Sequence, residues 1–141
     1  MARAFELAMT AEDLSAFFRQ AFPGDPQRNF EFEAFEPGFL RIKMVPDVTM
    51  LRPGDLVSGP TQMGLADRAA YAVILAHIGP VAMAVTSNLN MSFLRGVQKE
   101  PVFADAILLK LGRKLATVDV RLWQGSEQHI VAQATVTYAI P

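Results

Sequence analysis

A carboxylate stands in the most apolar part of this chain. In the stretch SGPTQMGLADRAAYAVI, from Ser58 to Ile74, Asp67 is surrounded in sequence by residues typical of a buried helix. Burying a carboxylate is costly unless it is paired, hydrogen-bonded or protonated. Two interpretations are open. Asp67 is either a base or nucleophile in a water-poor site, or a structural partner of an arginine such as Arg121.

The residues before Asp67 predict the start of a helix. Pro60 suits a first turn, where a missing N–H costs nothing, and Ser58 or Gly59 can cap it, while Gly79-Pro80 ends it. A helix N-terminus presents unpaired N–H groups and the positive end of the helix dipole. The Gly59 N–H is therefore suited to polarise a carbonyl, with Asp67 two turns further on.

The rest of the chain predicts the elements that position this helix. The capping pair Thr10 and Asp13 and the breaker Pro23-Gly24 delimit a short amphipathic helix. Alternation on both sides of Pro37-Gly38 predicts a hairpin, and Asp47 to Val57 has the weak periodicity of a connecting loop. Four strand-like runs follow the long helix, at 81–95, 102–111, 116–123 and 129–138.

The order of these elements predicts the fold class. The long helix is apolar on every side, which is typical of a helix enclosed by protein. Without repeats or linkers, residues 1–141 are expected to form a single α+β domain. In it, a curved and mainly antiparallel sheet wraps around the long central helix, and a short helix precedes the sheet.

Composition narrows the classes of partner. Of the 141 residues, 51% are hydrophobic, which favours buried subunit interfaces. The net charge is -1, which argues against a nucleic-acid partner. The apolar run 69–85 is shorter than a membrane span, and no export signal is evident, so a cytoplasmic protein is expected. Cysteine is absent, and His77 and His129 lack ligand spacing, so no metal site is expected.

Three short motifs follow one another along the chain. They are Ser58-Gly59-Pro60, then Leu65-Ala66-Asp67, and later Phe93-Leu94-Arg95-Gly96. In this order they resemble the hotdog-fold acyl-CoA thioesterases, particularly the group with the phenylacetate-pathway and 4-hydroxybenzoyl-CoA enzymes. The family pattern has His-Gly-Gly, an Asp or Glu in a Leu-Ala-Asp stretch, and Phe-Leu-Arg-Pro. Ser58 therefore replaces the family His and Pro60 the second Gly, while Gly59 keeps its N–H.

The resemblance implies a hotdog fold and hydrolysis of an acyl-CoA to the free acid and CoA. Asp67 would be the general base or nucleophile, and the Gly59 N–H would bind the developing oxyanion. No cofactor is implied beyond the coenzyme A of the substrate. A homodimer or a dimer-of-dimers tetramer is implied, with the strand 85–93 as the dimer edge and the site completed across it.

Further residues are candidates for contacts with substrate. Gly64 and Tyr71 share the helical face of Asp67, so they could border the acyl or pantetheine chain. Ser58 could supply a supporting polar contact, and Gln62 could either orient the thioester or a water or be a plain exposed residue of the first turn. Three polar residues of the strand 85–93 are either groups near the partner's Asp67 or part of a solvent-exposed face: Ser87, Asn88 and Asn90. Four cationic residues either bind the CoA phosphates or only keep the surface soluble: Arg95, Lys99, Arg113 and Lys114.

Two other functions compete with thioester hydrolysis. The replacement of the family His by Ser58 leaves open a protein that binds acyl or CoA ligands without hydrolysing them. An enoyl-CoA hydratase or dehydratase is less favoured, because no histidine stands near Asp67 in sequence to share the acid and base roles.

Overall fold

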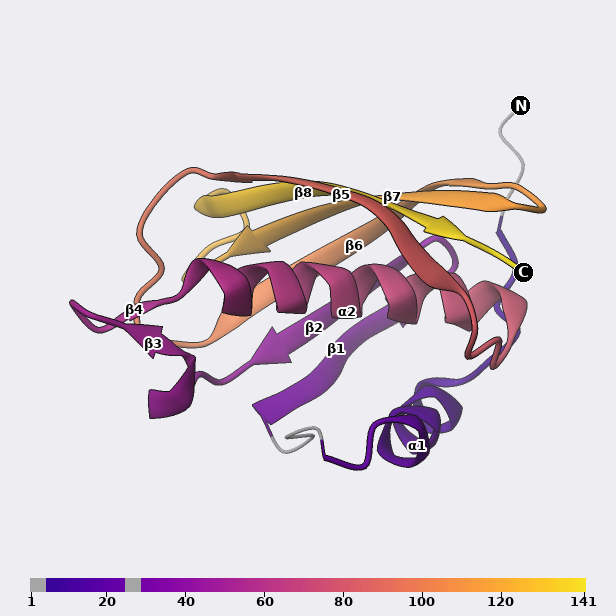
Figure 1. The fold of residues 1–141 in the computed structure, drawn as a ribbon, viewed down its shortest axis with the longest axis horizontal. Helices are drawn as coiled ribbons and strands as arrows, with labels where there is room; N and C mark the ends of the chain where they lie inside the picture. Colours follow the sequence, from indigo (N-terminus) through magenta and orange to yellow (C-terminus); the bar gives the residue numbers. More distant parts are fainter. Residues whose placement is uncertain (1–4, 25–28) are drawn as a thin grey trace.

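The computed structural model describes residues 5–24 and 29–141 of the chain. One long helix lies against one face of a six-stranded antiparallel sheet, as Figure 1 shows. The strand order is β1-β2-β6-β7-β8-β5, so β1 and β5 form the edges. The strands are β1 (Phe30–Glu36), β2 (Phe39–Met44), β5 (Val85–Phe93), β6 (Val102–Leu111), β7 (Leu115–Trp123) and β8 (Ile130–Ala139).

The central helix is α2 (Gly59–Ile78), with the bounds that the sequence predicts. Ser58 is its N-cap, Pro60 lies in the first turn, and Gly79 has φ +92°, a conformation that favours glycine. A continuous run of α2 from Ala69 to Ala76 is buried, because the inward residues of the sheet cover it. The expectation of an enclosed helix is confirmed for this run, whereas Met63, nearer the start of α2, is 41% exposed.

The N-terminal helix α1 (Ala11–Ala21) begins at a capping box. The Asp13 N–H donates to Thr10 Oγ1 at 3.0 Å, and the Thr10 N–H donates to the Asp13 carboxylate at 3.1 Å. Leu14 and Phe18 form its buried stripe, which packs beside the C-terminal half of α2 (Figure 1). The predicted hairpin is also confirmed, since β1 and β2 pair around the Pro37-Gly38 turn.

Two boundaries differ from the sequence prediction. The segment 47–57 is not a plain loop: it holds a 3₁₀ turn (Val48–Met50) and a two-stranded ribbon of β3 (Leu51–Arg52) and β4 (Leu56–Val57). Elements of two residues are too short to leave a periodic pattern. The strand expected from residue 81 begins at Val85, because turns occupy the residues after Gly79-Pro80.

Among the residues that the structure describes, the edge strand β5 pairs with β8 alone, so one side of its backbone has no strand partner there. Val85 and Phe93, at its two ends, are 53% and 49% exposed. Natural proteins usually protect long apolar edges, and pairing with another chain is one way to do so. Within the described ranges, no helix is long and apolar enough to cross a membrane.

Candidate active site

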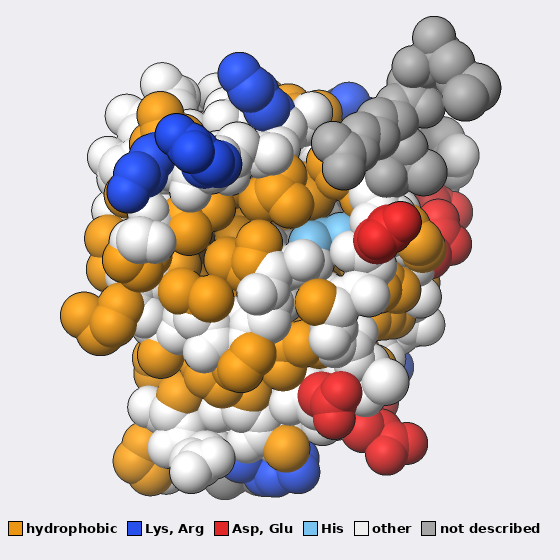
Figure 2. Space-filling model, turned by 90° about the vertical axis from the view of Figure 1, so that its right-hand side faces the viewer, with side chains coloured by type: hydrophobic (Ala, Val, Ile, Leu, Met, Phe, Trp, Pro, Cys, Tyr) orange, Lys and Arg blue, Asp and Glu red, His pale blue; other side chains and the backbone are white. Residues whose placement is uncertain are grey.

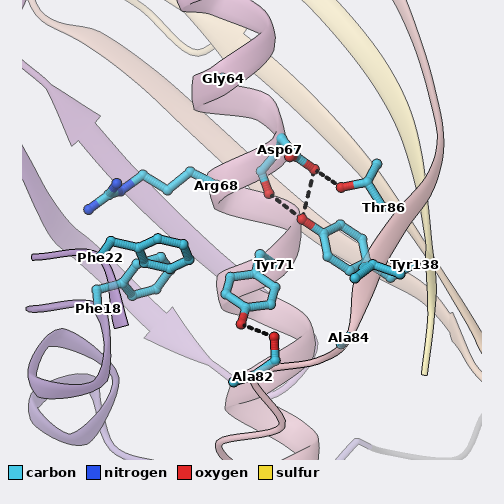
Figure 3. A pocket seen from close by; sticks show the side chains of 11 residues that line it. Phe18, Phe22, Gly64, Asp67, Arg68, Tyr71, Ala82, Ala84, Thr86 and Tyr138 are labelled. Carbon is cyan, nitrogen blue, oxygen red and sulfur yellow. Dashed lines mark hydrogen bonds between the residues drawn. The ribbon is translucent and has the colours of Figure 1, made fainter. Parts of the chain in front are cut away.

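The carboxylate of Asp67 is held by two hydroxyl groups from the sheet. Tyr138 Oη donates to Asp67 Oδ1 at 2.7 Å, and Thr86 Oγ1 donates to the same oxygen at 2.7 Å, as Figure 3 shows. Tyr138 Oη also lies 3.3 Å from the Asp67 carbonyl oxygen. Among the described residues, the half-buried carboxylate is therefore held by hydroxyl groups and forms no ion pair with a cation.

Strand register brings these hydroxyl groups together. Thr86 and Tyr138 are directly opposite each other in the β5–β8 ladder, so both side chains stand on the face that meets α2. A register shift between Thr86 and Asn88 makes Ser87 an extra residue. Simple alternation from Leu89 would have turned Ser87 inward instead of Thr86. Sequence reasoning missed Thr86 for this reason, and it missed Tyr138 because that residue is 71 positions from Asp67 in the chain.

A cavity of about 570 Å³ opens beside Asp67. Apolar and aromatic side chains supply most of its wall, and Gly64 leaves its side open because it has no side chain. The Tyr71 ring stacks on that of Tyr138, with ring centroids 5.6 Å apart. Other lining residues come from α1 and from the segment that enters β5: Phe18, Phe22, Ala82 and Ala84.

Both tyrosines in this cavity remain hydrogen-bond donors over the working pH range. Burial raises the pKa of Tyr138 far above its usual value, and the neighbouring Asp67 carboxylate raises it further. Burial also raises the pKa of Tyr71, whose hydroxyl donates to the Ala82 carbonyl at 3.0 Å. Of the two, Tyr138 donates to the Asp67 carboxylate, and as a neutral hydroxyl it cannot take the place of Asp67 as a base.

The other predicted group, Gly59, lies at the N-terminal end of α2, about two turns before Asp67. The Thr61 N–H is capped by Ser58 Oγ at 3.3 Å, and Pro60 has no N–H. The Gly59 N–H is a first-turn donor without an acceptor inside the helix. It borders a groove of about 430 Å³ whose other lining residues are Arg52, Gln62, Phe93, Leu94, Arg95 and Gly96.

Gln62 adds an unused acceptor to this groove. Its side chain is 5% exposed, and Nε2 donates to the Val57 carbonyl at 3.2 Å. The buried Oε1 has no hydrogen-bond partner among the described residues. A buried polar atom without a partner is costly, so this oxygen is suited to accept a bond from a water or ligand N–H.

The two parts of the candidate site are separated within one chain. Gly59 and Asp67 are eight residues apart on one helix, so they lie about 12 Å apart along its axis. They also border different cavities. One thioester carbonyl is too small to contact both, and a single chain does not bring the carboxylate and the oxyanion donor to one point.

Two of the polar residues predicted on β5, Asn88 and Asn90, lie on the opposite face of the sheet from the Asp67 of their own chain. Asn88 and Asn90 pair with Thr137 and Thr135 of β8, which stand on the sheet face away from α2. Both asparagines are exposed, as the solvent-face interpretation expects. Ser87, the extra residue, places its hydroxyl 3.3 Å from the Thr137 carbonyl.

The predicted phosphate-binding cations divide between two ends of the sheet. Arg95 lies in the Gly59 groove, where its guanidinium donates to the Ile130 carbonyl, and Lys99 follows shortly after it. Arg113 and Lys114 lie in the β6–β7 turn, at the end that faces the viewer in Figure 2, where Lys and Arg side chains gather above a hydrophobic area. The ten residues of β6 separate the pairs.

Arg121, the expected partner of Asp67, and Arg68, its neighbour in sequence, both contact other residues. Arg121 pairs with Asp119 at 3.1 Å, so the proposed ion pair with Asp67 is wrong. Arg68 lies over the rings of Phe18 and Phe30, 4.7 and 4.0 Å from their centroids, where it joins α2 to α1 and β1. Across residues 5–24 and 29–141, no group of three or more His, Asp or Glu could hold a metal ion.

Known proteins share both the fold and the site region. The thioesterase superfamily model matches residues 54–137, which include α2 and most of β8. A candidate thioesterase from Silicibacter sp. TM1040 is 38% identical, with a TM-score of 0.86, over 97% of this chain and 95% of its own. A phenylacetic acid degradation-related protein from Ralstonia eutropha JMP134 is 27% identical, with a TM-score of 0.74, over 88% and 98% of the two chains.

A third solved structure was obtained with a ligand. The Streptococcus mutans UA159 protein smu.793, bound to acetyl-CoA, is 23% identical, with a TM-score of 0.71, over 80% of this chain and 89% of its own. At that identity the likeness concerns the fold. With a helix enclosed by an antiparallel sheet, and a family match that spans more than half of its residues, this chain has the hotdog fold and belongs to the thioesterase superfamily.

Proposed function

We propose that this protein hydrolyses an acyl-CoA thioester to a free acid and CoA. The observation that carries the proposal is Asp67, a carboxylate fixed by two neutral hydroxyls at the wall of an aromatic-lined cavity. Carboxylates so placed serve as general bases or nucleophiles. Membership in the thioesterase superfamily supports the same class of reaction.

The complete site is proposed to form between two copies of the chain. In a two-fold pair of antiparallel β5 edges, the beginning of one strand lies beside the end of the other. Thr86, next to Asp67, would then lie near Phe93 of the partner copy, whose ring is close to its own Gly59. Pairing therefore joins the Asp67 cavity of one copy to the Gly59 groove of the other.

The proposed reaction uses groups from both copies. Asp67 removes a proton from water as the water oxygen attacks the thioester carbonyl carbon, or Asp67 itself attacks and water then cleaves the resulting anhydride. The Gly59 N–H of the partner copy donates to the carbonyl oxygen as it becomes negative. The C–S bond breaks and CoA leaves as the thiolate, which takes up the proton held by Asp67 in the general-base route, or a proton from water in the anhydride route. Gln62 Oε1, which has no hydrogen-bond partner within residues 5–24 and 29–141, belongs to a side chain of the same groove and is suited to orient the water.

The two cavities divide the substrate between them. The aromatic and alanine-lined cavity beside Tyr71 suits the apolar acyl group. The groove with Gly59 opens toward Arg95, so the pantetheine arm would leave by this route and bring the CoA phosphates near Arg95 and Lys99. Asn88 and Asn90 are left out of this proposal because edge pairing continues the two faces of the sheet and keeps them away from α2.

Thiol release from a panel of thioesters tests the function. Short, medium, long and aromatic acyl-CoAs are incubated with the native protein, and free CoA is measured with a thiol reagent. We expect turnover of at least one class, with kcat in the ordinary enzymatic range of about 1–10³ s⁻¹. Tight binding without thiol release would support an acyl-CoA-binding protein instead, and hydration of an enoyl-CoA would support a hydratase.

The proposed β5 edge interface predicts the oligomeric state. Lysine at the edge is a natural means of preventing strand pairing. We expect Asn88→Lys combined with Asn90→Lys to prevent pairing of the β5 edges. A dimer would then become a monomer, and a dimer of dimers would become a dimer, so the mass measured by sedimentation would be halved. The control is Thr135→Lys combined with Thr137→Lys, the ladder partners on the same face of β8. An unchanged mass in the β5 variant would contradict this interface.

A further inference from the structure

The structure assigns to Tyr138 a role that follows from the geometry of the Asp67 carboxylate. We propose that Tyr138 is the positioning residue that fixes Asp67 so that Oδ2 is the reacting oxygen. This inference rests on the proposed hydrolysis and deepens it. Tyr138 belongs to none of the three motifs that carry the family resemblance, and it stands 71 residues from Asp67 in the chain.

Both hydroxyl donors act on one carboxylate oxygen. Tyr138 Oη and Thr86 Oγ1 each lie 2.7 Å from Oδ1, which uses both lone-pair directions of that oxygen (Figure 3). Within the described residues, Oδ2 has no such donor. A carboxylate anchored through Oδ1 alone presents Oδ2 for proton removal or for attack on a carbonyl carbon.

Tyr138 is the more rigid of the two anchors. Its side chain is 4% exposed, whereas Thr86 is exposed on the edge strand. The hydroxyl of Tyr138 lies close to two acceptors, Oδ1 and the carbonyl oxygen of Asp67. Both acceptors belong to Asp67, so the O–H bond points toward that residue. The ring stacks on Tyr71, whose own hydroxyl is fixed on the Ala82 carbonyl. The Asp67 carboxylate is thus held from β8 by a hydroxyl that also lies beside the Asp67 backbone carbonyl.

This anchoring has a measurable consequence for the reaction. Displacement of a reacting group by about 1 Å can cost roughly 10²-fold in rate. Tyr138→Phe keeps the ring and its stacking but removes the hydroxyl. We expect kcat to fall by roughly 10- to 100-fold, the size of one hydrogen bond to a charged group. KM should change less than about 2-fold, because the acyl cavity keeps its shape.

A double-mutant cycle separates positioning from a merely structural role. In the Asp67→Asn background there is no base left to position, so adding Tyr138→Phe should change the residual rate by less than about 2-fold. Thr135→Val, which removes a hydroxyl from the outer face of β8, is the matched control and should leave kcat unchanged. A full second loss of kcat in the double variant would overturn the proposal.

Crystal structures provide a test that does not need activity. The native protein should show one carboxylate orientation, with Oδ1 on Tyr138, and Tyr138→Phe should show the carboxylate rotated or in two orientations. If no thioester is hydrolysed and this change is still seen, the proposed function fails while the anchoring stands. An unmoved carboxylate in Tyr138→Phe overturns the positioning role whatever the activity.

Discussion

Replacement of Asp67 by asparagine is expected to lower kcat by about 10²–10⁴-fold, the usual contribution of a positioned acid or base. Asparagine has nearly the same shape, and its Oδ1 can still accept from Tyr138 and Thr86. The group in the place of Oδ2 becomes an amide NH₂, which neither takes a proton nor attacks a carbonyl. The loss should therefore fall on kcat rather than on folding.

The measurement is thiol release from the best acyl-CoA of the panel, made with the native and the Asp67→Asn protein. Thermal unfolding of both proteins is measured first, to show that their melting temperatures are the same. KM, or the dissociation constant of the acyl-CoA, should stay similar, because the cavity wall is preserved. Asp119→Asn is a suitable control, since Asp119 is a carboxylate of the outer sheet face that pairs with Arg121. Equal turnover in native and Asp67→Asn proteins would remove Asp67 from the mechanism.

Gly59→Pro is expected to lower kcat by about 10²–10³-fold, the effect of deleting one oxyanion donor. Proline lacks the N–H but is favoured at the first position of a helix, so α2 should still form. Gly59→Ala is the matched control because it keeps the N–H. A Cβ at this position would lie 3.7 Å from the Phe93 ring, an ordinary contact. Equal losses in both variants would point to crowding rather than to the donor.

The same two variants also test whether the site is shared between copies. In a dimer of one Asp67→Asn chain and one Gly59→Pro chain, one of the two sites keeps both native groups. Random mixing should then restore about one quarter of native activity, because half of the dimers are mixed and each has one intact site. If each chain formed its site alone, every mixture would stay as inactive as its parents.

Local sequence signals were sufficient for much of the fold. The Thr10 capping box, the Ser58 cap with Pro60, and the Pro37-Gly38 turn each depend on neighbouring residues, and all form as predicted. The ribbon within 47–57 was missed because its two-residue strands are stabilised by pairing rather than by a pattern of their own. Short elements of this kind are recognised only once their partners are placed.

The surroundings of Asp67 depend on contacts that sequence patterns do not encode. Its carboxylate was recognised as anomalous from composition, yet the expected partner Arg121 stands on the other face of the sheet. Thr86 was hidden by one extra residue, Ser87, which turns Thr86 inward, and Tyr138 was hidden by its distance of 71 residues from Asp67 in the chain. Strand register across β5 and β8 is a long-range property, so alternation within either strand could not reveal it.

The distance between Gly59 and Asp67 along α2 also has a consequence in terms of mass action. If neither copy holds a complete site, the number of working sites follows the concentration of paired chains rather than of chains. Dilution below the dissociation constant of the pair would then silence the enzyme without unfolding it. The activity per chain would then rise with the concentration of the protein in the cell. In addition, a substrate that contacts both copies would stabilise the pair that hydrolyses it.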